Sequence, residues 1–254
     1  MHLISLFTYM DNPQNKFLIF PSSVLSTDGF LGLHALTRGL VKKDGQVDII
    51  TGQDSLTKYT AVLPFPKNVQ IITELPEQKV LLQFPGQDSN VKSIQWNQDK
   101  NQLNLYVAVE NGLFKADQMK LIKLAAQYKK VITIALGSLE ELGNLYEDKF
   151  KYIFNESKLV SIGADLKGDV KDVEKHADKS HTTLGEDIYE YIQAESLEID
   201  KDSADELLAA IFYATDGFKA DIKSAKAFEI CASLFSKGAT NSKAQALLEK
   251  FAAK

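Results

Sequence analysis

Apolar runs of strand length alternate with helix-periodic segments along the first half of the chain. Residues 16–20 and 46–50 are such runs, and each is followed by turn-forming residues. Between them, residues 26–43 place apolar side chains at helical spacing. This order predicts a βαβ unit with a parallel sheet. Residues 79–84 are a third strand candidate, which ends before Pro85.

A second pattern interrupts this rhythm. Residues 91–96 and 102–109 both alternate apolar and polar positions, and the polar stretch 97–101 between them is typical of a turn. The alternation places on one face the side chains of Ile94, Trp96, Leu103, Leu105, Val107 and Val109. We expect an antiparallel hairpin at about 91–109, inserted as an edge of the α/β sheet.

The aromatic residues Trp96 and Tyr106 of this hairpin have two interpretations. Most such aromatic side chains pack in a core or across strands, and that is the expected arrangement. The alternative is an exposed aromatic surface that serves as an interface.

The α/β rhythm resumes after the hairpin. The predicted elements are a helix at about 116–128, a strand at 130–136, a helix at 139–150 and a strand at 158–164. Residues 165–180 are highly charged and weakly periodic, so we expect a loop or an edge segment there.

The C-terminal third, from about 182 to 252, is predicted to be helical. Ser203 with Glu206, and Ser242 with Gln245, have the spacing of capping boxes. Gly238 is placed to end a helix. The predicted fold is therefore a single α/β domain over residues 1–254, with a mainly parallel sheet flanked by helices and the hairpin insertion.

Composition narrows the possible partners. The net charge is −5 and the isoelectric point is about 5.5, which argues against nonspecific binding to nucleic acid. The one cysteine, Cys231, lies in an apolar helical stretch and is expected to be a core thiol. The N-terminus lacks a basic region followed by a long apolar run, and no apolar stretch has membrane-spanning length. We expect a cytoplasmic protein without membrane association.

Four segments carry a resemblance to a known family: "SSVLSTDGFLGL", "VITIALGSLEELG", "KLVSIGAD" and "IFYATDGF", the last within the helical block 182–239. Together with the element order over about 16–240, the chain resembles the DHH phosphoesterases, which include RecJ-type nucleases, nanoRNases, cyclic-dinucleotide phosphodiesterases and exopolyphosphatases. The resemblance implies hydrolysis by two metal ions, usually manganese, held by aspartates and histidines at the carboxyl ends of strands. It also implies a second, smaller substrate-binding domain, which we expect this chain to lack.

The resemblance assigns the family's metal ligands to positions that hold other residues here. If Gly32 matches the glycine of the first motif, the remaining matches follow residue by residue. The matched ligand positions are Ser23, Thr27 and Gly29 in the first motif, Ala135 in the second, Gly163 and Ala164 in the third and Ala214 in the fourth. Thr215, Gly217 and Phe218 still fit the family pattern. Alanine and glycine supply no charge to hold paired cations, so no resident cofactor is expected.

Asp28, Asp165 and Asp216 lie next to the lost positions and have two interpretations. In one, they form a rewired manganese site, helped by His176 or His181. In the other, Asp28 caps a helix, Asp216 lies in a turn and Asp165 is a solvated loop acid. His176 and His181 are then surface residues, and His34 is structural or on the surface.

The sequence therefore predicts a catalytically inactive protein similar to DHH phosphoesterases that acts as a binding, scaffolding or regulatory module. Its contact surface would be the former cleft or the hairpin, and a protein partner or a homo- or hetero-oligomer is expected. One alternative is a divergent metal-dependent phosphoesterase acting on short oligonucleotides or cyclic dinucleotides. A second alternative is a nucleotide-binding sensor without turnover, in which the backbone amides of the turn in 26–32 bind a nucleotide or phosphate.

Overall fold

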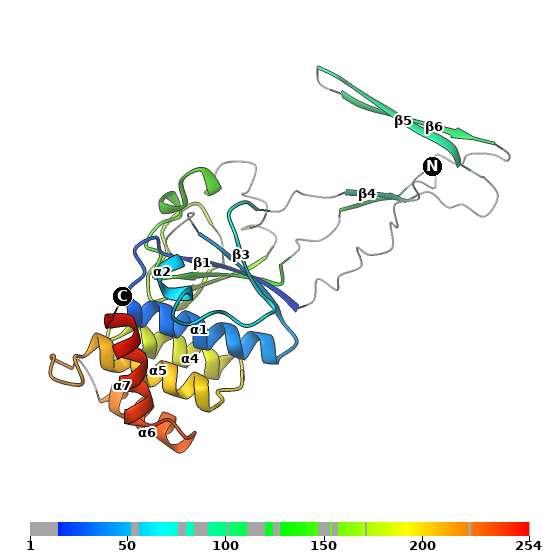
Figure 1. The fold of residues 1–254 in the computed structure, drawn as a ribbon. Helices are drawn as coiled ribbons and strands as arrows, with labels where there is room; N and C mark the ends of the chain where they lie inside the picture. The colour runs from blue at the N-terminus through cyan, green and yellow to red at the C-terminus, as the bar shows by residue number, and fades with distance from the viewer. Residues whose placement is uncertain are drawn as a thin grey trace. The chain divides into compact units, whose positions relative to one another are not determined.

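A computed structural model gives the arrangement of the chain (Figure 1). It describes residues 15–51, 56–75, 80–83, 91–100, 102–110, 120–123, 128–146, 153, 157–170, 172–222 and 225–253. The chain divides into two compact units, one of residues 1–76 with 126–254 and one of residues 77–125. This division does not test the prediction of a single domain over residues 1–254, which stays a prediction.

The first unit contains, within the described residues, a parallel sheet of six strands in the order β10-β9-β8-β1-β2-β3. The strands are β1 (Lys16–Pro21), β2 (Gln46–Ile50), β3 (Val69–Ile72), β8 (Lys130–Ile134), β9 (Lys158–Ile162) and β10 (Glu174–His176). The described helices are α1 (Thr27–Lys42), α2 (Thr57–Thr60), the 3₁₀ helix η4 (Leu139–Tyr146), α4 (Leu184–Ala194), α5 (Lys201–Ala214), α6 (Lys226–Ser236) and α7 (Asn241–Ala252). The predicted α/β class is confirmed.

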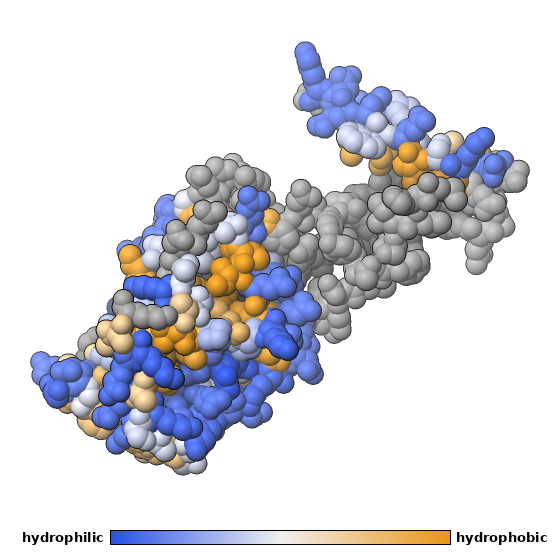
Figure 2. Space-filling model, viewed as in Figure 1, coloured by the Kyte–Doolittle hydropathy of each residue, from blue (hydrophilic) through white to orange (hydrophobic). Residues whose placement is uncertain are grey.

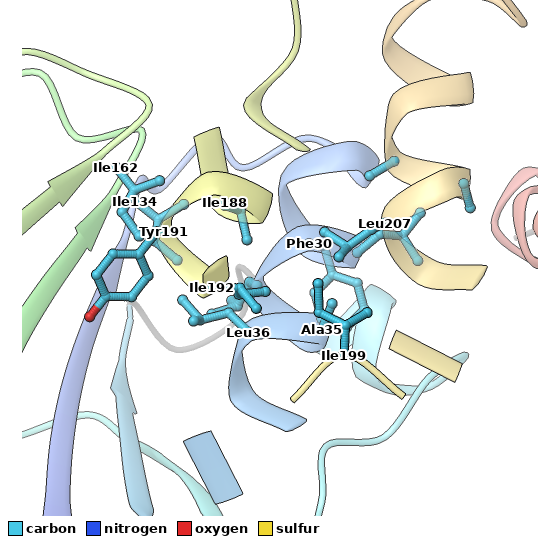
Figure 3. Packing of buried hydrophobic residues seen from close by; sticks show 14 of the residues in the cluster. Phe30, Ala35, Leu36, Ile134, Ile162, Ile188, Tyr191, Ile192, Ile199 and Leu207 are labelled. Atoms are coloured by element: carbon cyan, nitrogen blue, oxygen red, sulfur yellow. The ribbon is translucent and has the colours of Figure 1, made fainter. Parts of the chain in front are cut away.

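The central strands are mostly apolar because both faces of the sheet are covered. Ile19, Ile132 and Val160 face a core that also contains side chains of α1, α4 and α5 (Figure 3). Their neighbours Leu18 and Val131 face a second core on the opposite side of the sheet. Continuous apolar runs, which the sequence shows at these strands, are the expected signature of such double burial.

Cys231 lies in the first core, as predicted. Its side chain is buried, and this burial raises the pKa of the thiol to about 12. A thiol with a raised pKa holds little thiolate at neutral pH, so Cys231 is a packing residue.

The β1–α1–β2 order confirms the predicted βαβ unit, but two other predictions were wrong. Residues 79–84 do not add to the parallel sheet: β4 (Val80–Gln83) pairs antiparallel with β7 (Lys120–Lys123). The helix predicted at 116–128 is therefore contradicted at β7. A short apolar run fits a helix or a strand, and here the long-range partner strand supplies the backbone hydrogen bonds. The sequence reading missed β3, which is short and lies at the edge of the sheet.

The hairpin is confirmed as β5 (Val91–Asp99) and β6 (Gln102–Val109). Within the described residues it forms a separate two-stranded sheet, so its predicted place at an edge of the parallel sheet was wrong. The packed interpretation of Trp96 and Tyr106 was also wrong, since their side chains are 68% and 55% exposed. They lie on opposite faces, because Trp96 pairs with Leu105 whereas Tyr106 pairs with Gln95.

The predicted capping boxes at Ser203 and Ser242 were wrong by a few residues. Asp200 is the N-cap of α5 and accepts a hydrogen bond from the Ser203 backbone N–H at 2.7 Å, and Thr240 is the N-cap of α7. Asp200 is also held by Arg38 of α1, a tertiary contact that a local pattern cannot show. Gly238 follows α6 with φ of +95°, as predicted for a residue that ends a helix.

The remaining described segments agree with the prediction in outline. A 3₁₀ helix, η4, replaces the first part of the helix predicted at 139–150, and residues 147–150 lie outside the described residues. The charged segment 165–180 supplies the edge strand β10. Among the described helices, none has both the length and the apolar character needed to cross a membrane. The cytoplasmic setting stays a prediction.

The edge strand β10 is tied to the sheet by Glu174. Its carboxylate lies 2.5 Å from the Lys158 Nζ and 2.8 Å from the His176 Nε2. These partners lower the pKa of Glu174 from 4.5 to about 2, with Lys158 as the larger cause. A lowered acid pKa adds stability above the unfolded-state value, and this stability is lost as the pH falls from about 4.5 to about 2.

We therefore expect Glu174→Gln to lower the free energy of unfolding by about 1 kcal/mol at neutral pH, because the pair is partly exposed and screened. The loss should shrink as the pH falls below 4.5 and vanish near pH 2. Urea unfolding of both proteins across this range measures it. A difference that does not depend on pH would contradict the assignment.

Candidate functional site at the carboxyl edge of the parallel sheet

The strand order changes direction between β1 and β8. From β1 the chain continues to β2 and β3 on one side, whereas β8, β9 and β10 follow one another on the other side. In open α/β sheets, ligands bind outside the carboxyl ends of the strands at such a switch point. The backbone N–H of Ser22 donates to the Ile134 carbonyl at 2.8 Å, which joins the two strand ends there.

Two of the matched ligand positions at this edge are closed by leucine side chains. A Cβ atom added to Gly163 would lie 2.1 Å from the Leu184 Cδ1. A Cβ atom added to Gly29 would lie 2.6 Å from the Leu25 Cδ1 and 3.2 Å from the Leu184 Cδ2. No side chain fits at either glycine while these leucines hold their positions. The loops after β1 and β9 therefore meet at Leu184, in the first turn of α4.

The second matched loop adjoins the third. Ala135 follows β8 with φ of +52°, and its backbone N–H donates to the Ile162 carbonyl at 2.8 Å. A positive φ costs an alanine roughly 1–2 kcal/mol, so the turn is held by its surroundings. Gly163 has φ of +77°, which its lack of a Cβ allows. The next residue, Ala164, accepts a hydrogen bond through its carbonyl from the Ser161 hydroxyl.

The first and fourth matched loops hold the remaining positions. Ser23 is exposed and Thr27 is half-buried at the start of α1. Ala214 is the last residue of α5, and one turn earlier Ala210 packs beside Gly185 in the first turn of α4. The carboxyl end of α5 therefore runs beside the same helix end as Leu184.

The pattern that still fits the family at the end of α5 has a structural reason. The Thr215 hydroxyl donates to the Ile211 carbonyl at 2.7 Å and accepts from the Phe218 backbone N–H at 3.1 Å. Gly217 has φ of +64°. These contacts end α5 in a tight turn, so the pattern of Thr215, Gly217 and Phe218 has a structural explanation that requires no catalytic role.

The three aspartates next to the lost positions have different environments. Asp28 is buried in the first turn of α1, where its carboxylate accepts from the Ser26 hydroxyl. Asp165 is exposed and paired with Lys175, which lowers the pKa of its carboxyl. Asp216 is exposed and 3.7 Å from the Lys219 Nζ. The capping role for Asp28 was wrong, because Ser26 is the N-cap, while Asp165 and Asp216 lie in the loop and turn as predicted.

The histidines lie beside acids of their own segments. His181 is buried, with its Nδ1 2.8 Å from the Asp187 Oδ1, so its predicted surface placement was wrong. His176 is half-buried and contacts the Tyr191 ring edge-on at 5.0 Å between centroids. Within the described part of the chain, no group of three His, Cys, Asp or Glu residues has a geometry that could hold a metal ion.

Sequence reasoning missed three residues that shape this edge: Leu25, Leu184 and Glu141. The Glu141 Oε1 accepts from the backbone N–H groups of Gly137 and Ser138, both at 3.0 Å. The Glu141 carboxylate thus accepts hydrogen bonds from two backbone amides in the loop that follows β8. The spacing of Ser138 and Glu141, which matches a capping box, is a local signal for that contact. No local signal identifies the two leucines.

The described groups at this edge favour hydrogen bonding over coordination of hard cations. The loops after β1 carry the hydroxyls of Ser22, Ser23 and Thr27 and the buried carboxylate of Asp28. The buried carboxylates of Glu186 and Asp187 in the first turn of α4 are held by the Thr183 backbone N–H and by His181. A two-metal phosphoesterase needs several carboxylate or imidazole ligands for closely spaced cations. Leu184 fills the space beside both glycines and Leu25 fills the space beside Gly29, which leaves less room for such ligands there.

Comparison with known proteins returned a match only among solved structures. No protein-family model and no curated protein matched the sequence. The chain is similar in structure to an exopolyphosphatase-related protein from Bacteroides fragilis, with a TM-score of 0.56 and 14% sequence identity. The match covers 95% of this chain and 57% of that chain, so this chain spans little more than half of its neighbour. At this identity the similarity shows the α/β fold and nothing finer.

Proposed function

We propose that this chain is a catalytically inactive relative of the DHH phosphoesterases that acts as a binding, scaffolding or regulatory module. The observation that carries the proposal is the position of Leu184. Its Cδ1 atom lies 2.1 Å from the position that a Cβ atom on Gly163 would take. Its Cδ2 atom lies 3.2 Å from the corresponding position on Gly29. The resemblance places metal ligands on both of these loops.

The acids nearby give further support. Asp165 and Asp216 are each beside a lysine and largely exposed, and Asp28 is turned toward Ser26. Exposed pairs of this kind contribute roughly 0–1 kcal/mol, so the lysines oppose metal binding only weakly. The rewired manganese site would need all three to turn toward a common point.

Hydrolysis assays test the proposal. We expect the purified chain with millimolar manganese to hydrolyse short oligonucleotides, cyclic dinucleotides and inorganic polyphosphate no faster than the metal alone. Thermal unfolding should also be unchanged by manganese, whereas a ligand at about a hundred times its dissociation constant would add about 2.7 kcal/mol. Product formation is measured by chromatography and unfolding by calorimetry.

The enzyme alternative makes the opposite prediction. Asp28→Asn, Asp165→Asn and Asp216→Asn would each remove a manganese-dependent activity, while Asp221→Asn, a change at another exposed acid, would not. Such a result would overturn the proposal. Saturable stabilisation by a nucleotide without turnover would instead support the nucleotide-sensor alternative and locate the binding role in the former cleft.

A further inference from the structure

The β5–β6 hairpin is strongly amphipathic. Cross-strand pairing places on one face Val91, Ile94, Trp96, Gln98, Leu103, Leu105, Val107 and Val109, which we call the apolar face. The opposite face carries Ser93, Gln95, Asn97, Asp99, Gln102, Asn104, Tyr106 and Ala108. The apolar face has no charged residue, and its one polar side chain is Gln98.

This face is open in the structure. Ile94, Trp96, Leu103 and Leu105 are 61%, 68%, 63% and 41% exposed. Figure 2 shows hydrophobic residues gathered along one side of the hairpin and hydrophilic ones over the rest of its visible surface. Exposed large side chains in a continuous ladder are unusual for a chain that stays alone in water.

A two-stranded hairpin also has a stability requirement. By itself it is marginally stable in water, and it becomes stable when a further layer covers its apolar face. Within the described residues, β5 and β6 pair only with each other. The apolar face therefore needs a partner surface that is flat, apolar and free of charge.

We propose that this partner is the same face of a second copy of the chain, packed face to face about a two-fold axis. An isologous contact places each uncharged position against an uncharged surface, so it buries no unpaired charge. The segment 91–110 carries two lysines, Lys92 and Lys100, and two acids, Asp99 and Glu110, so its formal charge is zero. The net charge of −5 of the whole chain therefore does not extend to this contact.

The size of the face sets the strength of the dimer. The face has eight residues per copy, whereas a standard interface has about 20–30 residues a side, so the dimer belongs with the transient complexes. It is accordingly reversible, with Trp96 as its aromatic anchor. The inference rests on the proposed binding role, for which it names the partner, and it involves neither metal nor hydrolysis.

Trp96 is the one tryptophan of the chain, so its fluorescence reports on this face alone. We expect the mass measured by sedimentation to rise from 28.2 kDa toward twice that value as concentration increases, with a parallel blue shift of the emission. Leu105→Lys should weaken the association at least tenfold, since a lysine would be buried against an apolar layer. The matched control is Tyr106→Lys, the next residue on the opposite exposed face, which should leave it unchanged.

A mixture of Leu105→Lys and Leu105→Glu copies separates a lost contact from a lost hairpin. Opposite charges on facing surfaces should restore part of the association that each variant lacks alone. The proposal is overturned if the natural chain stays monomeric, or if both lysine variants weaken association equally. It also fails if Trp96 fluorescence is already blue-shifted in the dilute monomer, because that indicates that another part of the same chain covers the apolar face. It fails as well if the emission shifts only when anionic vesicles are added. Hydrolysis in the manganese assays would refute the proposal that the protein is catalytically inactive, but it would not change any of these results on dimer formation.

Discussion

Gly163→Ala is expected to lower the free energy of unfolding by about 3 kcal/mol. The positive φ of Gly163 costs an alanine roughly 1–2 kcal/mol, and the added methyl group would displace the Leu184 Cδ1, the movable end of a half-buried side chain, which adds about 1 kcal/mol. Urea unfolding measures the change. The substitution tests whether the carboxyl edge of the sheet is as closed as the leucine contacts indicate.

Gly217→Ala is the matched control. Gly217 also has a positive φ, of +64°, but a Cβ there would have nothing within 4 Å, so only the backbone cost of roughly 1–2 kcal/mol is expected. In the double variant Gly163→Ala, Leu184→Ala, the space vacated by leucine should accept the new methyl group. The loss of stability in the double variant should therefore be about 1 kcal/mol smaller than the sum of the losses in the two single variants. Equal losses at both glycines would mean that Leu184 does not close the site.

Glu206→Leu is expected to destabilise the protein by about 3 kcal/mol, because it leaves the buried His34 ring without its acid. The His34 Nδ1 lies 3.0 Å from the Glu206 Oε2, and both side chains are buried between α1 and α5. Burial raises the pKa of the Glu206 carboxyl, while His34 acts in the opposite direction. Removing either partner alone strands a polar group in the core.

His34→Phe should cost about as much alone, since it leaves a buried carboxylate. Phenylalanine keeps the ring that stacks on Phe65 at 5.3 Å between centroids. The double variant, in which both partners are apolar, should lose no more than about 1–2 kcal/mol, so the two changes are strongly coupled. A double-mutant cycle in urea measures the coupling. Additive losses would show that the pair contributes nothing as a pair.

The strand pattern of the first unit was readable from local sequence. The runs that became β1, β2, β8 and β9 are mostly apolar because the sheet is covered on both faces, and this burial leaves a recognisable local signal. The hairpin was readable because one strand face is apolar and the other polar, which gives strict alternation. The short strands β3 and β7 were missed because runs of four residues carry too little periodicity to decide their type.

The candidate site also has one part that the sequence predicts and one part that depends on the tertiary structure. That glycine and alanine occupy positions matched to metal ligands is visible in the sequence, because it concerns residue types within four short segments. What fills the space beside them is a tertiary fact. Leu25 lies four residues before Gly29, whereas Leu184 begins α4, and only the packing of α4 against the loops after β1 and β9 brings Leu184 to both glycines.

The sequence by itself determined the fold class, the central parallel strands and the residue types at the matched positions, since burial and residue type are recorded locally. The tertiary structure decided the antiparallel pairing of β4 with β7, the contact of Arg38 with Asp200 and the pairing of His34 with Glu206. It also decided the closure of the carboxyl edge by Leu184. Each of these depends on a contact between segments far apart in the chain, and such contacts leave no periodic pattern in either segment.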